Sequence, residues 1–205
     1  MKLGICSDIH LEFGYLPIDN KEGIDVLVLA GDILVAKTLT SEGTPHKKTA
    51  EQFRTFFSEC SAKFPHVVFI MGNHEHYHGD FNETAKTLRK FCASIGSNIH
   101  FLDKEAKQID DVIFIGQTLW TDFNGESPTS MNIARGTMND FRIVDNSSKD
   151  HRFTPDDALE DYKLSLAFID EATKTQSDKK CVVVGHHAPS HKSVKPRYEH
   201  DYHMN

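Results

Sequence analysis

The stretch Val67-Val68-Phe69-Ile70-Met71-Gly72-Asn73-His74-Glu75 decides the fold of this chain. Its first five residues are apolar and rich in branched side chains, which is typical of a short strand covered on both faces. Gly72 then permits a tight turn, and three polar residues follow it directly. The pattern predicts a buried strand whose carboxyl end presents Asn73, His74 and Glu75.

Similar runs elsewhere in the chain indicate the fold class. Four more segments are short, apolar and bounded by Gly, Asp or Asn, namely Lys2–Cys6, Val26–Ala30, Val112–Ile115 and Cys181–Val184. We expect each to form a strand covered on both faces. Because helical patterns lie between these runs, the sequence predicts an α/β fold.

Three segments show the spacing of amphipathic helices. In Lys47–Phe64 and Asp80–Ile95 apolar residues recur every three or four positions, and Gly96 is placed to end the second helix. Thr154 is a candidate N-cap for a third helix. The predicted buried stripe of that helix is Leu159, Tyr162, Leu166 and Ile169. Residues 108–112 predict a tight hairpin turn, and hence some antiparallel pairing after the first three strands.

The composition fits one domain over residues 1–205. The chain has 205 residues, of which 39% are hydrophobic. Domains commonly contain about 100–200 residues, and this length suffices for a core without disulfides. The apolar runs fall far below the about 20 residues of a transmembrane helix, and the N-terminus carries no secretory apolar segment. We therefore expect no membrane segment.

The net charge and the cysteines indicate which partners and which cellular compartment to expect. The net charge of −7 argues against a non-specific nucleic-acid binder, so nucleic acid remains possible but is not favoured. The cysteines Cys6, Cys60, Cys92 and Cys181 form no CxxC pair. We interpret them as reduced packing residues of a cytoplasmic protein. The oligomeric state stays open.

Side chains that can bind a metal follow four of the predicted strands. They are Asp8, His10, Asp32, Asn73 and His186. Taken singly, such residues are often turn or cap residues. Together they are expected to converge, because ligands of open α/β sheets gather at the carboxyl ends of the strands. Carboxylate, imidazole and amide ligands without a thiolate favour Mn²⁺, Fe or Zn²⁺, and of these we favour Mn²⁺.

We expect this centre to hold two divalent metal ions. Two ions about 3.5–4 Å apart need an anionic bridge, for which Asp32 in the middle strand is the candidate. Such a pair lowers the pKa of a shared water, giving a bridging hydroxide near neutral pH, and clamps two phosphate oxygens during in-line attack. His74, beside Asn73, would then protonate the leaving-group oxygen as the catalytic residue.

The ordered set DxH, GD, GNHE and GHH, each at a strand end, resembles the calcineurin-like metallophosphoesterase superfamily. The resemblance implies a layered β-sandwich of mixed sheets flanked by helices. It also implies His74 as the catalytic group. The implied metal ligands are Asp8 and His10 for the first ion, Asn73 and His186 for the second, and Asp32 as the bridge. Residues 118–123 and 138–142 resemble a small bacterial and phage subgroup.

The chain departs from the family in two blocks. The second block reads Gly31-Asp32-Ile33-Leu34-Val35 and lacks the outer acid that the family often carries there. No GHxH block follows His187, although in the family its two histidines complete both metal sites. We therefore expect a truncated or naturally short chain with its C-terminal part missing, reduced metal affinity and reduced turnover. His200 and His203 lack the spacing and the glycine of that block, so we interpret them as surface or disordered residues, with ligation as the alternative.

Several nearby residues have two readings. We place His187 behind His186, next to the metal ligands rather than among them. Arg142 could steer a phosphate, although an exposed ion pair is an equal alternative. His76 and His78 are interpreted as solvated loop histidines, with a place at the pocket rim as the alternative.

Three functions are compatible with these residues. The first is a metal-dependent phosphoesterase that hydrolyses a small phosphomonoester or phosphodiester. The second is a non-catalytic metal-binding or scaffold protein of the same fold, and the third is a nuclease. His74 favours an enzyme, because a scaffold needs no leaving-group acid. The absence of a tract rich in Lys and Arg disfavours a processive nuclease.

Overall fold

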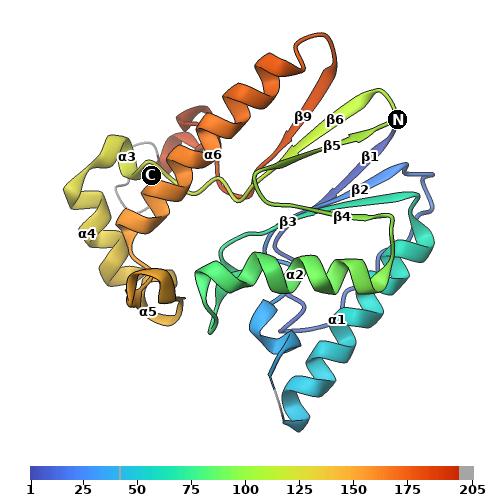
Figure 1. The fold of residues 1–205 in the computed structure, drawn as a ribbon, viewed down its shortest axis with the longest axis horizontal. Helices are drawn as coiled ribbons and strands as arrows, with labels where there is room; N and C mark the ends of the chain where they lie inside the picture. Colours follow the sequence, from blue (N-terminus) through green and yellow to red (C-terminus); the bar gives the residue numbers. More distant parts are fainter. Residues whose placement is uncertain (42, 199–205) are drawn as a thin grey trace.

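The computed structural model describes residues 1–41 and 43–198, and two facing sheets lie between its helical layers (Figure 1). The first sheet is parallel, in the order β1 (Leu3–Cys6), β2 (Val26–Ala30), β3 (His66–Ile70) and β4 (Ile99–Leu102). The second has the order β5 (Glu105–Ile109), β6 (Val112–Gly116) and β9 (Lys180–Val184). Since β5 is antiparallel and β9 parallel to β6, this sheet is mixed, and the predicted α/β class is confirmed.

Helices flank this pair of sheets (Figure 1). The helices α1 (Thr44–Lys63) and α2 (Phe81–Ile95) cover the outer face of the first sheet, and α6 (Pro155–Thr175) runs beside the second. Short elements gather at one end, at the left of the picture, and include α3 (Phe123–Glu126), α4 (Pro128–Thr137) and α5 (Asp140–Ile143). The small strands β7 (Asp145–Asn146) and β8 (His151–Arg152) pair with each other.

The central strands are buried on both faces, as the sequence predicted. In β2, Leu27 and Leu29 pack into the core beneath α1 and α2, while Val26 and Val28 belong to the core between the sheets. In β3, Phe69 likewise packs into the core beneath α1 and α2, as Leu27 and Leu29 do in β2. This two-residue period is the reason that a run of apolar residues forms a strand here.

The predicted helix ends and hairpin are also confirmed. Asp80 caps α2 through the backbone N–H of Asn82, and Gly96 follows its last residue. Thr154 caps α6 in a reciprocal capping box with Asp157. The hairpin joins β5 to β6.

The structure corrects three sequence predictions. The strands β1 and β9 are not covered on both faces, since Ile5 of β1 is 71% exposed and Val183 of β9 is 44% exposed. Leu166 is 42% exposed rather than part of the buried stripe. The residues that α6 buries are Pro155, Asp157, Ala158, Leu159, Asp161 and Ser165. The strands β4 and β5 were not predicted, because His100 interrupts the apolar run of β4 and β5 is mostly polar.

Across the described residues, no helix is both long and apolar enough to cross a membrane.

Candidate metal centre

Three of the predicted ligands sit in unusual backbone conformations directly after strands. Asp8, His10 and Asp32 have φ angles of 55°, 49° and 54°, in the left-handed region that costs a non-glycine residue about 1–3 kcal/mol. The loops after β1 and β2 hold these conformations together, because the N–H of Asp8 donates to Gly31 and the N–H of His10 donates to the Asp32 carbonyl. The turns therefore place both loops at one edge of the sheet.

Gly31 and Gly72 make the close approach of these loops possible. Gly31 has a φ of 88°, and a Cβ there would lie 2.6 Å from both the Gly72 nitrogen and the His186 ring. A Cβ on Gly72 would lie 2.2 Å from Oδ1 of Asp32. The glycines of the GD and GNHE motifs are thus required by the space around Asp32 and His186.

Glu75 connects the loop after β2 with the loop after β3. Its fully buried carboxylate accepts hydrogen bonds from the N–H groups of Asp32, Ile33, Leu34 and Gly72, at 2.6–3.2 Å. Burial raises the pKa of Glu75 to about 7, whereas these four donors favour the charged form. Glu75 thereby fixes the backbone from which Asp32 projects.

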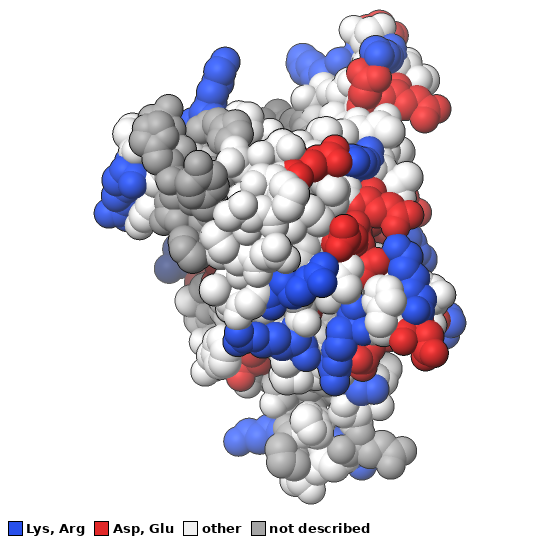
Figure 2. Space-filling view, turned by 90° about the vertical axis from the view of Figure 1, so that its left-hand side faces the viewer, with Lys and Arg blue, Asp and Glu red and all other residues white. Residues whose placement is uncertain are grey.

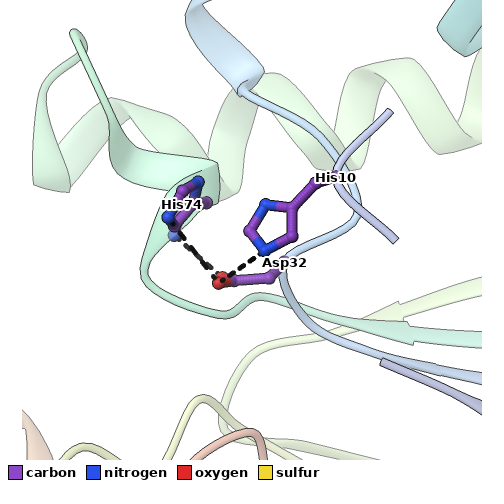
Figure 3. A group of neighbouring side chains, drawn as sticks. All are labelled: His10, Asp32 and His74. Atoms are coloured by element: carbon purple, nitrogen blue, oxygen red, sulfur yellow. Dashed lines mark hydrogen bonds and ion pairs between the residues drawn. The ribbon is translucent and has the colours of Figure 1, made fainter. Parts of the chain in front are cut away.

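The Asp32 carboxylate is the centre of the cluster. It is buried, and Nε2 of three imidazoles faces it, from His186 at 3.4 Å, His10 at 3.8 Å and His74 at 4.0 Å. Figure 3 shows the rings of His10 and His74 turned toward this carboxylate. Burial disfavours the charge of Asp32, but the hydrogen bond from His186 and the neighbouring imidazoles hold the pKa of this carboxyl below its usual value.

Two groups of potential ligands share Asp32. Asp8, Asp32 and His186 offer ligand atoms within 4.8 Å of one another, and so do His10, Asp32 and His74. Asp32 therefore occupies the position expected of a bridge. The grouping differs from the one that the resemblance implies, since Asp8 lies with His186, and His10 lies with His74.

His186 is held by the last residue of β2. Its Nδ1 lies 2.9 Å from the carbonyl of Ala30, so this nitrogen is the donor and Nε2 faces Asp32. Burial lowers the pKa of His186, but the contacts with Asp32 and the Ala30 carbonyl outweigh it and raise the pKa to about 9.

Asn73 is oriented by a chain of hydrogen bonds. Its amide nitrogen donates to the Tyr77 hydroxyl at 3.3 Å, and that hydroxyl lies 3.4 Å from the buried carboxylate of Asp140. Burial raises the pKa of Asp140. Because the amide nitrogen is occupied, the side-chain oxygen of Asn73 is the atom left to bind a cation.

Sequence reasoning missed Glu12. Its Oε1 lies 3.1 Å from Nδ1 of His10 and 3.1 Å from Nδ1 of His74. Although burial opposes its charge, the hydrogen bonds of His74 and His10 hold the pKa of Glu12 below its usual value. The signal that could have revealed it is the alternation Asp8-x-His10-x-Glu12, which continues the DxH motif by one more polar residue.

His187 and His76 are both more buried than solvated loop histidines would be. His187 packs its ring against His186 and Trp120, with centroids 4.8 and 5.2 Å away, as expected for a residue behind the ligands. His76 is 2% exposed and stacks on Phe81, so its interpretation as a solvated histidine is wrong. His78 is exposed, as expected.

The remaining candidates lie away from these contacts or cannot be placed. Arg142 is exposed on α5 and donates to the carbonyl of Gly136. His200 and His203 lie outside the described residues.

The side chains present fit a pair of divalent ions. Carboxylates and imidazole nitrogens are suitable donors for Mn²⁺, Fe and Zn²⁺. Two of the distances from Nε2 to Asp32 exceed a normal hydrogen bond, so a cation rather than a proton suits the space between those atoms. Each imidazole also has its Nδ1 bound on the far side, an arrangement that is usual for metal-binding histidines.

Three kinds of comparison with known proteins each give a match. An uncharacterised protein of Acanthamoeba polyphaga mimivirus is 28% identical over 201 residues, which cover 91% of this chain and 68% of that protein. The crystal structure of the phosphopantetheinyl hydrolase of Mycobacterium tuberculosis has the same fold, with a TM-score of 0.67 and 14% identity over all of this chain and 75% of that one. The profile of the calcineurin-like phosphoesterases matches residues 1–205. The chain therefore belongs to the calcineurin-like phosphoesterase family.

Proposed function

We propose that this protein is a metal-dependent hydrolase of a small phosphomonoester or phosphodiester. The observation that carries the proposal is the convergence of two ligand groups on the shared carboxylate of Asp32. Family membership supports the same reaction class. Two divalent ions, with Mn²⁺ favoured, are the proposed cofactors.

In this proposal Asp8, Asp32, Asn73, His10 and His186 hold the ions. When bound, the ions would supply Lewis acidity and would lower the pKa of a bound water molecule, so that it ionises near neutral pH. His74 holds a proton on Nε2 and gives it to the oxygen of the leaving group as the bond between phosphorus and that oxygen breaks.

His74 has a second possible role, because it lies in one ligand group with His10 and Asp32. The two roles differ in their consequences. If His74 is the acid, His74→Ala reduces turnover by about 10²–10⁴-fold and leaves Mn²⁺ affinity nearly unchanged. If His74 is a ligand, the same substitution weakens Mn²⁺ binding as well.

We propose further that the sites of this chain bind metal weakly. Among the described residues, each group of His and carboxylate ligands contains only three side chains. Elemental analysis after dialysis is expected to find fewer than two ions per chain. Two tightly retained ions per chain would contradict this expectation.

The surface charge supports a small phosphorylated substrate over a nucleic acid. On the face shown in Figure 2, basic and acidic side chains stand beside one another rather than forming a field of one sign. The helices on this side carry ion pairs such as Arg135 with Asp156 at 3.0 Å and Lys163 with Glu126 at 2.8 Å. The four free cysteines are consistent with the proposed cytoplasmic location.

Hydrolysis of 4-nitrophenyl phosphate and bis(4-nitrophenyl) phosphate, with Mn²⁺, Fe²⁺ or Zn²⁺, tests this function. We expect activity from the natural sequence, a large loss of activity in Asp32→Asn, and no loss in His46→Gln, which changes an exposed histidine of α1. His74→Ala should lose most of its activity toward phenyl phosphate, whose leaving group needs a proton. A protein that hydrolyses neither ester with any of these metals would contradict the proposal and favour the scaffold function.

A further inference from the structure

Glu12 lies between two imidazoles that have different roles in the proposed site. Its Oε1 is within 3.1 Å of Nδ1 of both His10 and His74. The two rings meet edge to face, with centroids 4.3 Å apart. A carboxylate oxygen is an acceptor only, so both contacts require that Nδ1 of each ring carries the proton.

The same contacts fix where the opposite nitrogens point. Nε2 of His10 and Nε2 of His74 both face Oδ2 of Asp32, at 3.8 and 4.0 Å (Figure 3). With Nδ1 occupied by Glu12, Nε2 is the nitrogen through which each ring meets a metal ion or a substrate.

Within the described part of the chain, Glu12 has few side-chain contacts other than those with the two imidazoles. Its side chain is 14% exposed, and Oε2 is buried with no hydrogen-bond partner among the described residues. A buried carboxylate that binds no lysine or arginine is costly, so the two N–H donors are the contacts that offset its burial. In addition, the sequence lacks the outer acid of the GD block, and Glu12 brings a carboxylate to His74 from a different loop.

We propose that Glu12 is a positioning residue that holds both His10 and His74 as the Nδ1–H tautomer. This directs Nε2 of His10 to the proposed metal ion. In His74 the Nδ1 proton stays hydrogen-bonded to Glu12, so the imidazolium gives its second proton, held on Nε2, to the leaving-group oxygen and returns to the Nδ1–H tautomer. The role in turnover rests on the proposed phosphoesterase function, whereas the tautomers are a property of the chain itself.

The tautomers can be measured in the metal-free protein by long-range ¹H–¹⁵N correlation of the histidine rings, at a pH where the imidazoles are neutral. Signals are assigned with the variants His10→Asn and His74→Asn. We expect both rings to carry the proton on Nδ1, to keep it in Glu12→Gln, whose amide oxygen can still accept, and to lose that preference in Glu12→Ala. His186 is the internal control, because its Nδ1 is bound by the Ala30 carbonyl, so its signals should not change.

A His10 or His74 ring that carries its proton on Nε2 in the natural sequence would overturn the proposal. Unchanged tautomers in Glu12→Ala would overturn it as well. If Glu12→Ala does not fold, the spectra of the natural sequence and of Glu12→Gln still decide the question.

Removing the Glu12 carboxylate should change how strongly kcat depends on the leaving group. Phenolate needs a proton to leave, whereas 4-nitrophenolate does not. Glu12→Ala should therefore reduce kcat for phenyl phosphate at least about tenfold more than kcat for 4-nitrophenyl phosphate. The ratio should be largely restored in Glu12→Gln and unchanged in Glu22→Gln, which alters an exposed glutamate.

A double-mutant cycle tests whether this effect of Glu12 on turnover acts through His74. In a His74→Ala background, Glu12→Ala should no longer change the ratio for the two esters, because the proton donor is already absent. An undiminished change there would contradict the role toward His74. If the natural sequence hydrolyses no ester at all, the proposed function fails, and the tautomer measurement alone decides the role of Glu12.

Discussion

At the scale of single residues, the centre depends on groups that lie behind the ligands. Glu75 binds four backbone N–H groups from two loops, and Glu12 binds two imidazoles. Neither belongs to the two candidate ligand groups, yet each fixes residues of those groups. Such outer contacts usually change metal affinity by about 10–100-fold when they are removed.

Glu75→Gln is expected to destabilise the protein. A glutamine offers one acceptor oxygen and turns its NH₂ group toward N–H donors, so at least one buried donor loses its partner. The free energy of unfolding should fall by about 3 kcal/mol, measured by urea denaturation. The exposed Glu83→Gln on α2 is the matched control and should have little effect. Equal stability of the two variants would show that the four hydrogen bonds contribute little.

His186 should make the stability of the metal-free protein depend on pH. Burial lowers its pKa, but Asp32 and the Ala30 carbonyl raise it from 6.5 to about 9 in the folded state. A raised histidine pKa stabilises the fold fully below pH 6.5, and this contribution is lost as the pH rises through about 9. The loss should be on the order of 3 kcal/mol, seen as the difference between the natural sequence and His186→Asn in denaturation at several pH values.

Metal binding should show the opposite trend. A metal ion needs neutral His186, so binding releases a proton and Mn²⁺ affinity should rise over the same pH interval. Affinity that falls as the pH rises would argue that His186 is not a ligand.

At the scale of the elements, local chemistry explains most of what was predicted correctly. The helix α6 begins where Thr154, Pro155 and two acids follow one another, and α2 begins after Asp80. These are contacts within a few residues, so they leave a clear trace in the sequence. For the polar strand β5 the only trace in the sequence is the hairpin turn that joins it to β6, and β5 forms because β6 offers it a partner.

Thr154→Ala should weaken α6 at its first turn. The substitution removes the hydroxyl that accepts from the Asp157 N–H and leaves that donor unpaired. The expected cost is about 1 kcal/mol in thermal or urea unfolding. Thr154→Ser keeps the hydroxyl and should restore most of that loss. A cost shared equally by both variants would point to the lost methyl group instead.

At the scale of the whole molecule, the two sheets are one folding unit. Their facing side chains form a common core that includes Val28, Val68, Leu102 and Phe114. Gly116 lies so close to the first sheet that a Cβ would be 2.6 Å from the Leu102 side chain. The proposed metal ligands come from both sheets, since His186 follows β9 and the others follow β1, β2 and β3.

Phe114→Ala should therefore destabilise both sheets together. The side chain is fully buried, so the expected loss is about 3–5 kcal/mol. Hydrogen exchange of the amides in β2, β3 and β6 should accelerate by the same factor. Phe13→Ala is the control, because Phe13 is 81% exposed. Faster exchange confined to β6 would show that the first sheet is stable alone.

The sequence by itself determined the strand ends and the helix caps and indicated the candidate ligands, because each depends on residues that are close along the chain. It also indicated the family through the order of four short motifs. Only the tertiary structure decided that β1 and β9 are edge strands, that His76 is buried and that Glu12 meets His74 across 62 positions. Such contacts join residues far apart in sequence, and the folding of both sheets around one core, rather than any local preference, brings them together.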